Sequence, residues 1–301
     1  MAYHVPVLLP ESVAALDIKP GGTYVDVTFG GGGHSRHILE QLAAGARLFS
    51  FDQDKDAEDQ AQHIDNPDFT FVKANFRYLK KYLRLYGVKE VDGILADLGV
   101  SSHQFNVPER GFSTRFDGPL DMRMDPEAPL SAKEVLATYA EEDLHRIFGM
   151  YGEVKNARTL ARQIVMARSG GSIETIADFK KAIAGLIQRG KENKYLAQVF
   201  QALRIEVNDE LKALEEMLEQ AAAVLKPGGR LVVISYHSLE DRLVKNFISK
   251  GKFFGEVEKD LFGNEIKPLA SVTRKAIVPA EKELQENNRS RSAKLRVAQK
   301  L

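Results

Sequence analysis

The sequence contains neither cysteine nor tryptophan among its 301 residues. Without cysteine the chain cannot form disulfides, thiolate metal sites or a cysteine nucleophile, and this composition fits a reducing compartment. No apolar run is long enough to cross a membrane, and no basic segment precedes an apolar one near the N-terminus. We therefore expect a cytoplasmic protein with no membrane partner.

The sequence also has no net charge, because 42 lysines and arginines balance 42 aspartates and glutamates. This balance argues against a protein that binds polyanions through its overall charge, although local patches can still contact a structured nucleic acid. One basic run closes the chain without any acid in it: Arg289, Arg291, Lys294, Arg296 and Lys300. The run is either a solvated tail or an RNA contact.

Four consecutive glycines, Gly30–Gly33, follow the apolar residues 24–29 and precede residues 34–42, which have helical spacing. Glycines in a strand-to-helix turn allow positive φ and bring the first N–H groups of the helix to a ligand, although a purely structural turn is the alternative. A second apolar stretch ends on Asp52, roughly twenty residues later, where such folds hold ribose hydroxyls. The pattern predicts a nucleoside-type cofactor. Ser35 replaces the last glycine of the dinucleotide fingerprint, which disfavours NAD.

Apolar and helical stretches alternate through most of the chain. Strands are expected over 24–28, 47–52, 69–73, 91–96 and 230–234, with an edge strand within 270–278. Such alternation predicts an α/β fold with a doubly wound, mostly parallel sheet. Between the fourth and fifth strands lie a long irregular segment, an all-helical stretch from Ser131 to about Leu203, and a long helix over 195–225.

Several longer motifs occur in order. They are 26–35, 97–102, 118–125, 200–208, 235–242 and 291–296. Together they closely resemble the bacterial small-subunit ribosomal RNA cytosine-N4 methyltransferases over nearly the whole chain. Four positions differ from the residues usual in this family: Val27, Gly31, Asn288 and Ser290. These differences affect packing or the C-terminal tail.

The resemblance implies a class I methyltransferase-like Rossmann fold that uses S-adenosylmethionine. It implies methyl transfer to the N4 amine of a cytidine in the decoding region of 16S ribosomal RNA, with naked RNA or the assembled small subunit as the partner. The implied domains are a methyltransferase domain in two parts, 1–104 and 206–301, and a helical substrate-recognition insertion, 105–205. The implied cofactor contacts are Gly32, Gly33, His34, Asp52, Phe76, Asp97 and Gln104.

Asp97 is the candidate catalytic residue, because it follows the fourth strand, where amino-methyltransferases of this fold carry an acceptor for the amine. The lone pair of the cytosine amine is delocalised into the ring, and an acceptor on its N–H groups would localise it as the nitrogen pyramidalises. The alternative for Asp97 is a turn cap after the strand.

Other residues have more than one interpretation. Tyr236, His237, Phe112 and Phe116 could hold an extruded base, but aromatic side chains more often pack in a core. Arg123 could bind phosphate or join its acidic neighbours in an internal network. The basic residues of the insertion could track RNA phosphates or form a solvated helix surface: Lys133, Lys155, Arg158, Arg162, Arg168, Lys180 and Lys181.

We expect no metal site, because His34 and His37 lack a third ligand at fixed spacing. Two other functions remain as alternatives. An NAD-dependent oxidoreductase would rest only on the first strand, the glycine loop and Asp52. A non-catalytic ribosome assembly factor would use the insertion and the basic tail.

Overall fold

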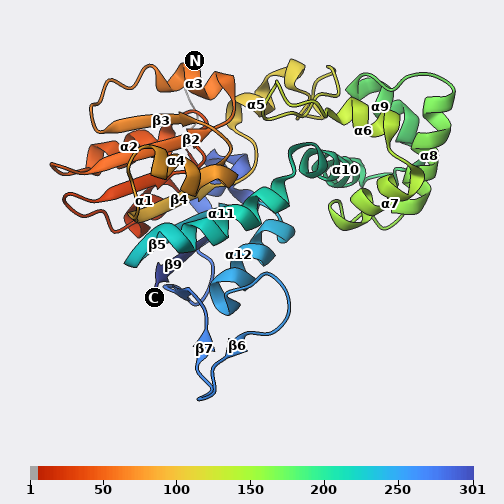
Figure 1. Ribbon diagram of the computed structural model, residues 1–301. Helices are drawn as coiled ribbons and strands as arrows, with labels where there is room; N and C mark the ends of the chain where they lie inside the picture. The colour runs from red at the N-terminus through yellow and green to blue at the C-terminus, as the bar shows by residue number, and fades with distance from the viewer. Residues whose placement is uncertain (1–5) are drawn as a thin grey trace. The chain divides into compact units, whose positions relative to one another are not determined.

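The computed structural model describes residues 6–301, and residues 1–5 of the predicted first part lie outside this range. Two compact units are present (Figure 1). One contains the chain up to Gly99 together with Leu211–Leu301, and the other is Val100–Glu210. The predicted insertion, 105–205, falls within the second unit.

The first unit contains a seven-stranded sheet in the order β3-β2-β1-β4-β5-β9-β8. Its strands are β1 Thr23–Asp26, β2 Arg47–Asp52, β3 Phe69–Lys73, β4 Val91–Asp97, β5 Leu225–Ser235, β8 Leu269–Ser271 and β9 Lys294–Lys300. Neighbours from β3 to β5 pair in parallel, whereas β9 is antiparallel to β5 and β8 is antiparallel to β9. The predicted doubly wound, mostly parallel sheet is confirmed. Because parallel strands end at one edge, the residues that follow them meet there.

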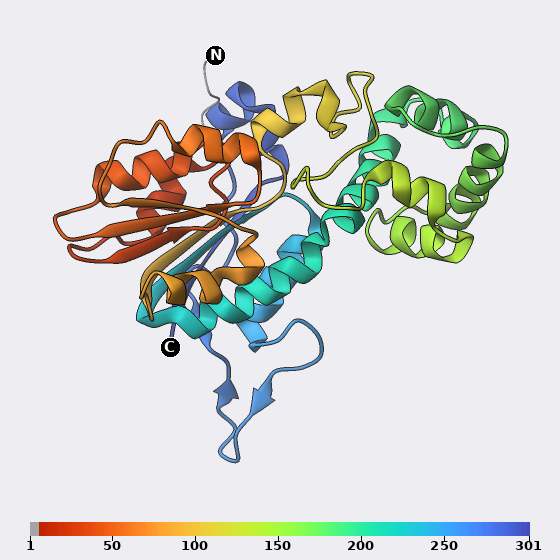
Figure 2. The same ribbon diagram turned by 45° about the horizontal axis from the view of Figure 1, so that its top comes forward.

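Helices cover both faces of this sheet (Figure 2). They are α1 Leu9–Ala15, α2 Gly33–Gln41, α3 Lys55–Ala61, α4 Leu79–Leu85, α11 Glu210–Val224, α12 Ser238–Lys250 and α13 Glu281–Glu286. Leu231 and Val233 of β5 pack in one core with α4, α11 and α12, and Val232 and Ile234 pack in another with α1 and α2. Burial on both faces explains why this strand reads as a continuous apolar run.

The second unit is built from helices. They are α5 Ser102–Asn106, α6 Ala132–Thr138, α7 Glu141–Met150, α8 Ala157–Ser169, α9 Ile176–Ile183 and α10 Glu192–Asn208. Ser131 and Glu134 form the expected capping box of α6. Phe148, Leu160 and Phe179 are fully buried in a core made only of residues from this unit. The unit therefore has its own hydrophobic stabilisation.

The predicted single helix over 195–225 is wrong. Asp209, with φ of 48°, separates α10 from α11. A left-handed residue interrupts the helical hydrogen bonds, and aspartate tolerates this conformation better than most residues. The break coincides with the boundary between the two units.

Of the two interpretations of the basic run, the solvated tail does not hold for residues 294–300, which form β9. Leu295, Val297 and Ala298 are buried, while Arg296 and Lys294 donate hydrogen bonds to Asp241 at 2.7 and 3.2 Å. Within the predicted edge strand 270–278, only the start belongs to β8. A small hairpin, β6 Glu258–Lys259 and β7 Glu265–Ile266, precedes β8.

Asp241 on α12 should stabilise the last strand. Burial alone would raise its pKa, but hydrogen bonds from Arg296 and Lys294 outweigh burial and lower it. Asp241→Asn should therefore reduce the free energy of unfolding by about 1–3 kcal/mol at pH 7, measured by urea denaturation. The deficit should shrink in acid, because a carboxylate with a lowered pKa stabilises above its unfolded-state pKa and loses this effect as pH falls through its folded-state value.

The matched control is Glu258→Gln, which breaks an exposed pair with Lys252. Exposed pairs contribute little, so this variant should unfold at the wild-type urea concentration. Equal stability of Asp241→Asn and wild type at pH 7 would contradict the role given to Asp241.

Candidate functional site

The glycine turn joins β1 to α2 at the carboxyl edge of the sheet. Gly30 and Gly32 have φ of 53° and 77°, in the region that favours glycine. A Cβ on Gly32 would lie 2.6 Å from the Phe29 ring, and one on Gly33 would lie 2.2 Å from the Pro6 ring. Gly33 is thus covered by Pro6 on that side. Among residues 6–301, no side chain caps the start of α2, so its first N–H groups suit an anionic or polar ligand.

Asp52, at the end of β2, closes this turn. Its carboxylate accepts hydrogen bonds from the N–H of Gly30 at 2.8 Å and of Asp54 at 2.9 Å. Burial raises the pKa of Asp52 to about 6, and the two hydrogen bonds oppose this rise. A carboxylate oxygen has two lone pairs, so Asp52 can hold the turn and still accept hydrogen bonds from a diol.

Asp97, at the end of β4, has a carboxylate held between two side chains. Tyr236 donates its hydroxyl to Oδ1 at 2.6 Å, and Nδ1 of His34 lies 3.7 Å from Oδ2. Burial raises the pKa of Asp97 to about 6, against the charge of His34 and the hydrogen bond from Tyr236. Its side chain is 23% exposed, and among the described residues no backbone N–H donates to it. This arrangement favours a functional role over a turn cap.

Asp26, at the end of β1, is a buried residue to which the sequence gave no role. Its carboxylate accepts hydrogen bonds from Ser35 Oγ at 2.6 Å and from the N–H of Thr28 at 3.0 Å. Thr28 Oγ1 in turn accepts the N–H of Asp97 at 2.6 Å. Burial raises the pKa of Asp26, and the charge of His34 opposes this. Asp26 thus fixes the turn to the backbone of Asp97. Its position at the end of a strand, four residues before the glycine turn, was the available signal.

The remaining predicted cofactor residues fall in both units. Nε2 of His34 lies 3.2 Å from the carbonyl oxygen of Val7, so this nitrogen is the donor. Phe76 follows β3, begins a short 3-10 helix and packs against the sheet core. Gln104 lies in the helical unit, where it forms a capping box with Ser101 at the start of α5. Direct contact of these residues with a cofactor stays a prediction.

The candidate aromatic residues differ in their surroundings. Tyr236 follows β5 and contacts Asp97, as described above. His237 caps α12, where its Nδ1 accepts the N–H of Glu240 at 3.4 Å. Phe112 is buried in the helical core, whereas Phe116 is 44% exposed. Phe112 is therefore a core residue.

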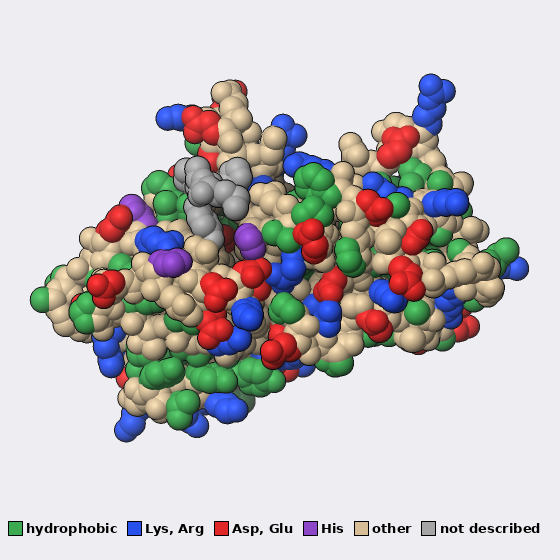
Figure 3. Space-filling view, turned by 90° about the horizontal axis from the view of Figure 1, so that it is seen from above, with side chains coloured by type: hydrophobic (Ala, Val, Ile, Leu, Met, Phe, Trp, Pro, Cys, Tyr) green, Lys and Arg blue, Asp and Glu red, His purple; other side chains and the backbone are tan. Residues whose placement is uncertain are grey.

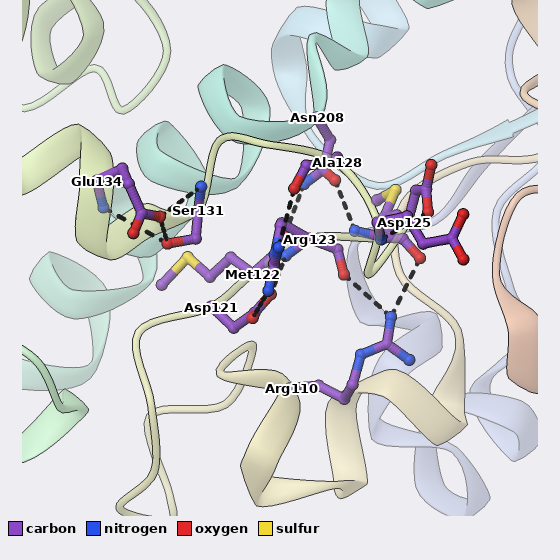
Figure 4. A network of polar contacts seen from close by, with 11 residues as sticks. Arg110, Asp121, Met122, Arg123, Asp125, Ala128, Ser131, Glu134 and Asn208 are labelled. Atoms are coloured by element: carbon purple, nitrogen blue, oxygen red, sulfur yellow. Dashed lines mark hydrogen bonds and ion pairs between the residues drawn. The ribbon is translucent and has the colours of Figure 1, made fainter.

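Within the helical unit, Arg123 belongs to an internal network (Figure 4). Its guanidinium donates two hydrogen bonds to Asp121 and one to the carbonyl oxygen of Ala128. Asn208 accepts the N–H of Met124 at 2.7 Å and donates to the carbonyl of Met122 at the same distance. The Arg123 guanidinium is thus bonded to Asp121 and Ala128. Arg123 therefore orders the loop around residues 121–128 rather than offering a free guanidinium to phosphate.

The basic residues of the insertion separate into two groups. Lys133 pairs with Glu174, Arg168 donates to two backbone carbonyls, and Lys180 donates to one. The others are exposed and have no ion-pair partner in the described part of the chain: Lys155, Arg158, Arg162 and Lys181. On the face shown in Figure 3, acidic and basic side chains are interspersed. Any RNA contact would thus depend on local cations.

The first unit offers groups that suit S-adenosylmethionine. Asp52 could accept hydrogen bonds from ribose hydroxyls, and the first N–H groups of α2 have no side-chain cap within residues 6–301. Asp97, whose pKa is about 6, places negative charge at this edge at pH 7, which would favour a cationic sulfonium. The donor set therefore fits this cofactor.

The turn should tolerate a side chain at Gly32 poorly. Gly32→Ala requires a left-handed alanine and displacement of the Phe29 ring, whereas Gly21, with φ of 70°, has no atom within 4 Å of its Cβ position. Gly21→Ala should cost about 1–2 kcal/mol of stability from backbone strain alone. In urea denaturation Gly32→Ala should cost more than Gly21→Ala. Equal losses would mean that Phe29 moves freely and that the turn is not close-packed.

Comparison with known proteins identifies the family and relatives of this chain. The family model described as the MraW methylase family matches residues 1–301. Proteins named ribosomal RNA small subunit methyltransferase H are similar: that of Cytophaga hutchinsonii is 59% identical over 99% of both chains, and that of Bacteroides fragilis strain YCH46 is 60% identical over 99% of this chain and 97% of its own.

Among solved structures, a putative rRNA methylase from Clostridium thermocellum is similar with a TM-score of 0.46 and 13% sequence identity. The alignment covers 99% of this chain and 100% of that chain. The fold is therefore assigned from the strand order and strand directions of the sheet. Within residues 6–301, no helix combines the length and apolarity needed to span a membrane. The match of the family model to the entire sequence, together with these relatives, shows that the chain belongs to the MraW methylase family.

Proposed function

We propose that this protein transfers a methyl group from S-adenosylmethionine to the N4 amine of a cytidine in the decoding region of 16S ribosomal RNA, in the cytoplasm. The observation that supports this most directly is the Asp97 carboxylate at the end of β4, beside the glycine turn. The names of the relatives support the RNA substrate. The family match leaves no support for the NAD-dependent oxidoreductase.

The first unit would hold the cofactor. S-adenosylmethionine, when bound, supplies an electrophilic methyl group on a sulfonium. Asp52 would accept hydrogen bonds from the ribose hydroxyls, and Phe76 would contact the adenine. The backbone from Gly32 to His34 would face the polar end of the cofactor, and a contact from Gln104 stays a prediction of the sequence. Because a sulfonium leaves as a neutral thioether, positioning and exclusion of water would supply most of the rate.

Asp97 would act on the cytosine amine. Its ionised carboxylate would accept a hydrogen bond from the amine, localise the nitrogen lone pair, and take the proton that the nitrogen loses when the new bond to carbon forms. With a pKa of about 6, Asp97 is mainly ionised at pH 7 and still basic enough to receive this proton.

The helical unit would recognise the RNA. Its exposed cations, including Arg158 and Arg162 on α8, can contact phosphates, while Arg123 keeps the loop in one conformation. Its separate core would allow it to present these cations from a rigid support.

Asp97→Asn should lower kcat by about 10²–10³-fold, because the amide cannot take the proton and offers a weaker acceptor. Transfer of labelled methyl to purified small subunits measures this. The wild-type rate should fall as pH drops below about 6, where Asp97 becomes protonated. The control is Asp92→Asn on the same strand, where the carboxylate accepts from Thr23 and Lys226 instead. Full activity of Asp97→Asn would remove Asp97 from the mechanism.

The same assay tests the proposed activity as a whole. Wild-type protein should methylate small subunits or their naked RNA, and mass spectrometry should find methylcytidine in the decoding region. Failure with both substrates would favour the non-catalytic assembly factor.

The double variant Arg158→Glu, Arg162→Glu should raise the KM for small subunits by about tenfold or more and weaken its dependence on salt, because each lost phosphate contact reduces counterion release. Thermal unfolding should stay unchanged, since both side chains are exposed. Arg158→Lys, Arg162→Lys keeps the charge and should retain most of the affinity. An unchanged KM in the glutamate variant would place the RNA contact elsewhere.

A further inference from the structure

We propose that Tyr236 is a positioning residue for methyl transfer, whose hydroxyl fixes Oδ1 of Asp97 so that Oδ2 accepts the cytosine amine. This inference rests on the proposed function, because it gives each oxygen of the Asp97 carboxylate a separate partner: Tyr236 for Oδ1 and the cytosine amine for Oδ2. It differs from the role of an aromatic platform for the extruded base, which the sequence suggests for Tyr236.

The geometry separates the two carboxylate oxygens. The Tyr236 hydroxyl donates to Oδ1 at 2.6 Å, whereas Oδ2 faces His34, whose Nδ1 is 3.7 Å away. The terminal torsion of an aspartate is broad, so nothing within Asp97 itself would hold one oxygen toward a substrate. A short hydrogen bond from a buried phenol restricts this rotation.

Tyr236 is itself held at the start of α12. Glu240, which is only 3% exposed, accepts the N–H of Tyr236 at 2.8 Å and that of His237 at 3.3 Å. The Tyr236 side chain packs against the sheet core that contains Ile234 and Leu295. The backbone and the ring are therefore both restrained, and the hydroxyl reaches Asp97 from a fixed support.

The charges around this pair keep Tyr236 a donor. Burial raises the pKa of Tyr236 well above its ordinary value, and the charge of Asp97 raises it further, so the phenol stays protonated. Four groups act on Asp97 besides burial. His34 on α2 and the Tyr236 hydroxyl lower its pKa, whereas Asp26 at the end of β1 and Glu240 on α12 raise it. Removing the hydroxyl should therefore raise the pKa of Asp97.

Tyr236→Phe tests the inference, because it deletes the hydroxyl and keeps the ring. We expect kcat to fall roughly ten- to a hundredfold, the effect of one hydrogen bond to a charged group, while the KM for small subunits changes little. The acid limb of the pH–rate profile should move to higher pH. Tyr24→Phe is the matched control, since the Tyr24 hydroxyl is also buried in this unit but accepts the N–H of Lys19. It should keep the wild-type profile.

A measurement without cofactor or RNA gives an independent readout. Carboxyl carbon NMR on protein with labelled aspartate should report a higher pKa for Asp97 in Tyr236→Phe than in wild type. Glu240→Gln keeps a side-chain oxygen for the Tyr236 N–H, so it should keep kcat near the wild-type value, while the loss of its charge should lower the pKa of Asp97. Glu240→Ala loses this oxygen as well, so its kcat should fall as that of Tyr236→Phe does.

The outcomes separate this inference from the proposed function. If wild-type protein transfers methyl groups and Tyr236→Phe keeps both its rate and its pH profile, the positioning role is overturned while the proposed function stands. An unchanged pKa of Asp97 would also overturn it. If wild-type protein transfers no methyl group, the proposed function fails, whatever the NMR result.

Discussion

Burial raises the pKa of Asp26, Asp52 and Asp97, which end neighbouring strands at one edge of the sheet. Removing a carboxylate from water is costly unless hydrogen bonds replace the lost hydration. Each of these acids meets a different donor: Ser35 for Asp26, the Gly30 N–H for Asp52, and the phenol of Tyr236 for Asp97. The site exists because the fold supplies these donors.

The parallel sheet explains why the donors converge. Its strands share one carboxyl edge, so chain segments far apart in sequence meet there without a long loop. Thr28 shows the consequence, since it bonds to Asp26 beside it and also to the backbone of Asp97 on the next strand. A displacement of the glycine turn should therefore also move Asp97, the residue that we propose accepts a hydrogen bond from the cytosine amine.

The sequence predicted those features that depend on local patterns. Continuous apolar runs located the buried strands, and spacing located Asp52. It did not predict β9, because cations alternate with Leu295 and Val297 and the run reads as a charged tail. It missed the break at Asp209, which depends on the backbone conformation of one residue. Nor could spacing pair Tyr236 with Asp97, which lie 139 positions apart.

The arginines of the helical unit have two kinds of surroundings: some bond to residues within the unit, and others are exposed to solvent. Arg123 and Arg168 donate to partners within the unit, and replacing either would leave buried acceptors unsatisfied. Arg158 and Arg162 are exposed and unpaired in the described part of the unit, so binding phosphate with them would break no internal bond. RNA affinity should therefore come from the exposed arginines. On the function proposed above, the loop containing Arg123 would keep one conformation while the RNA binds.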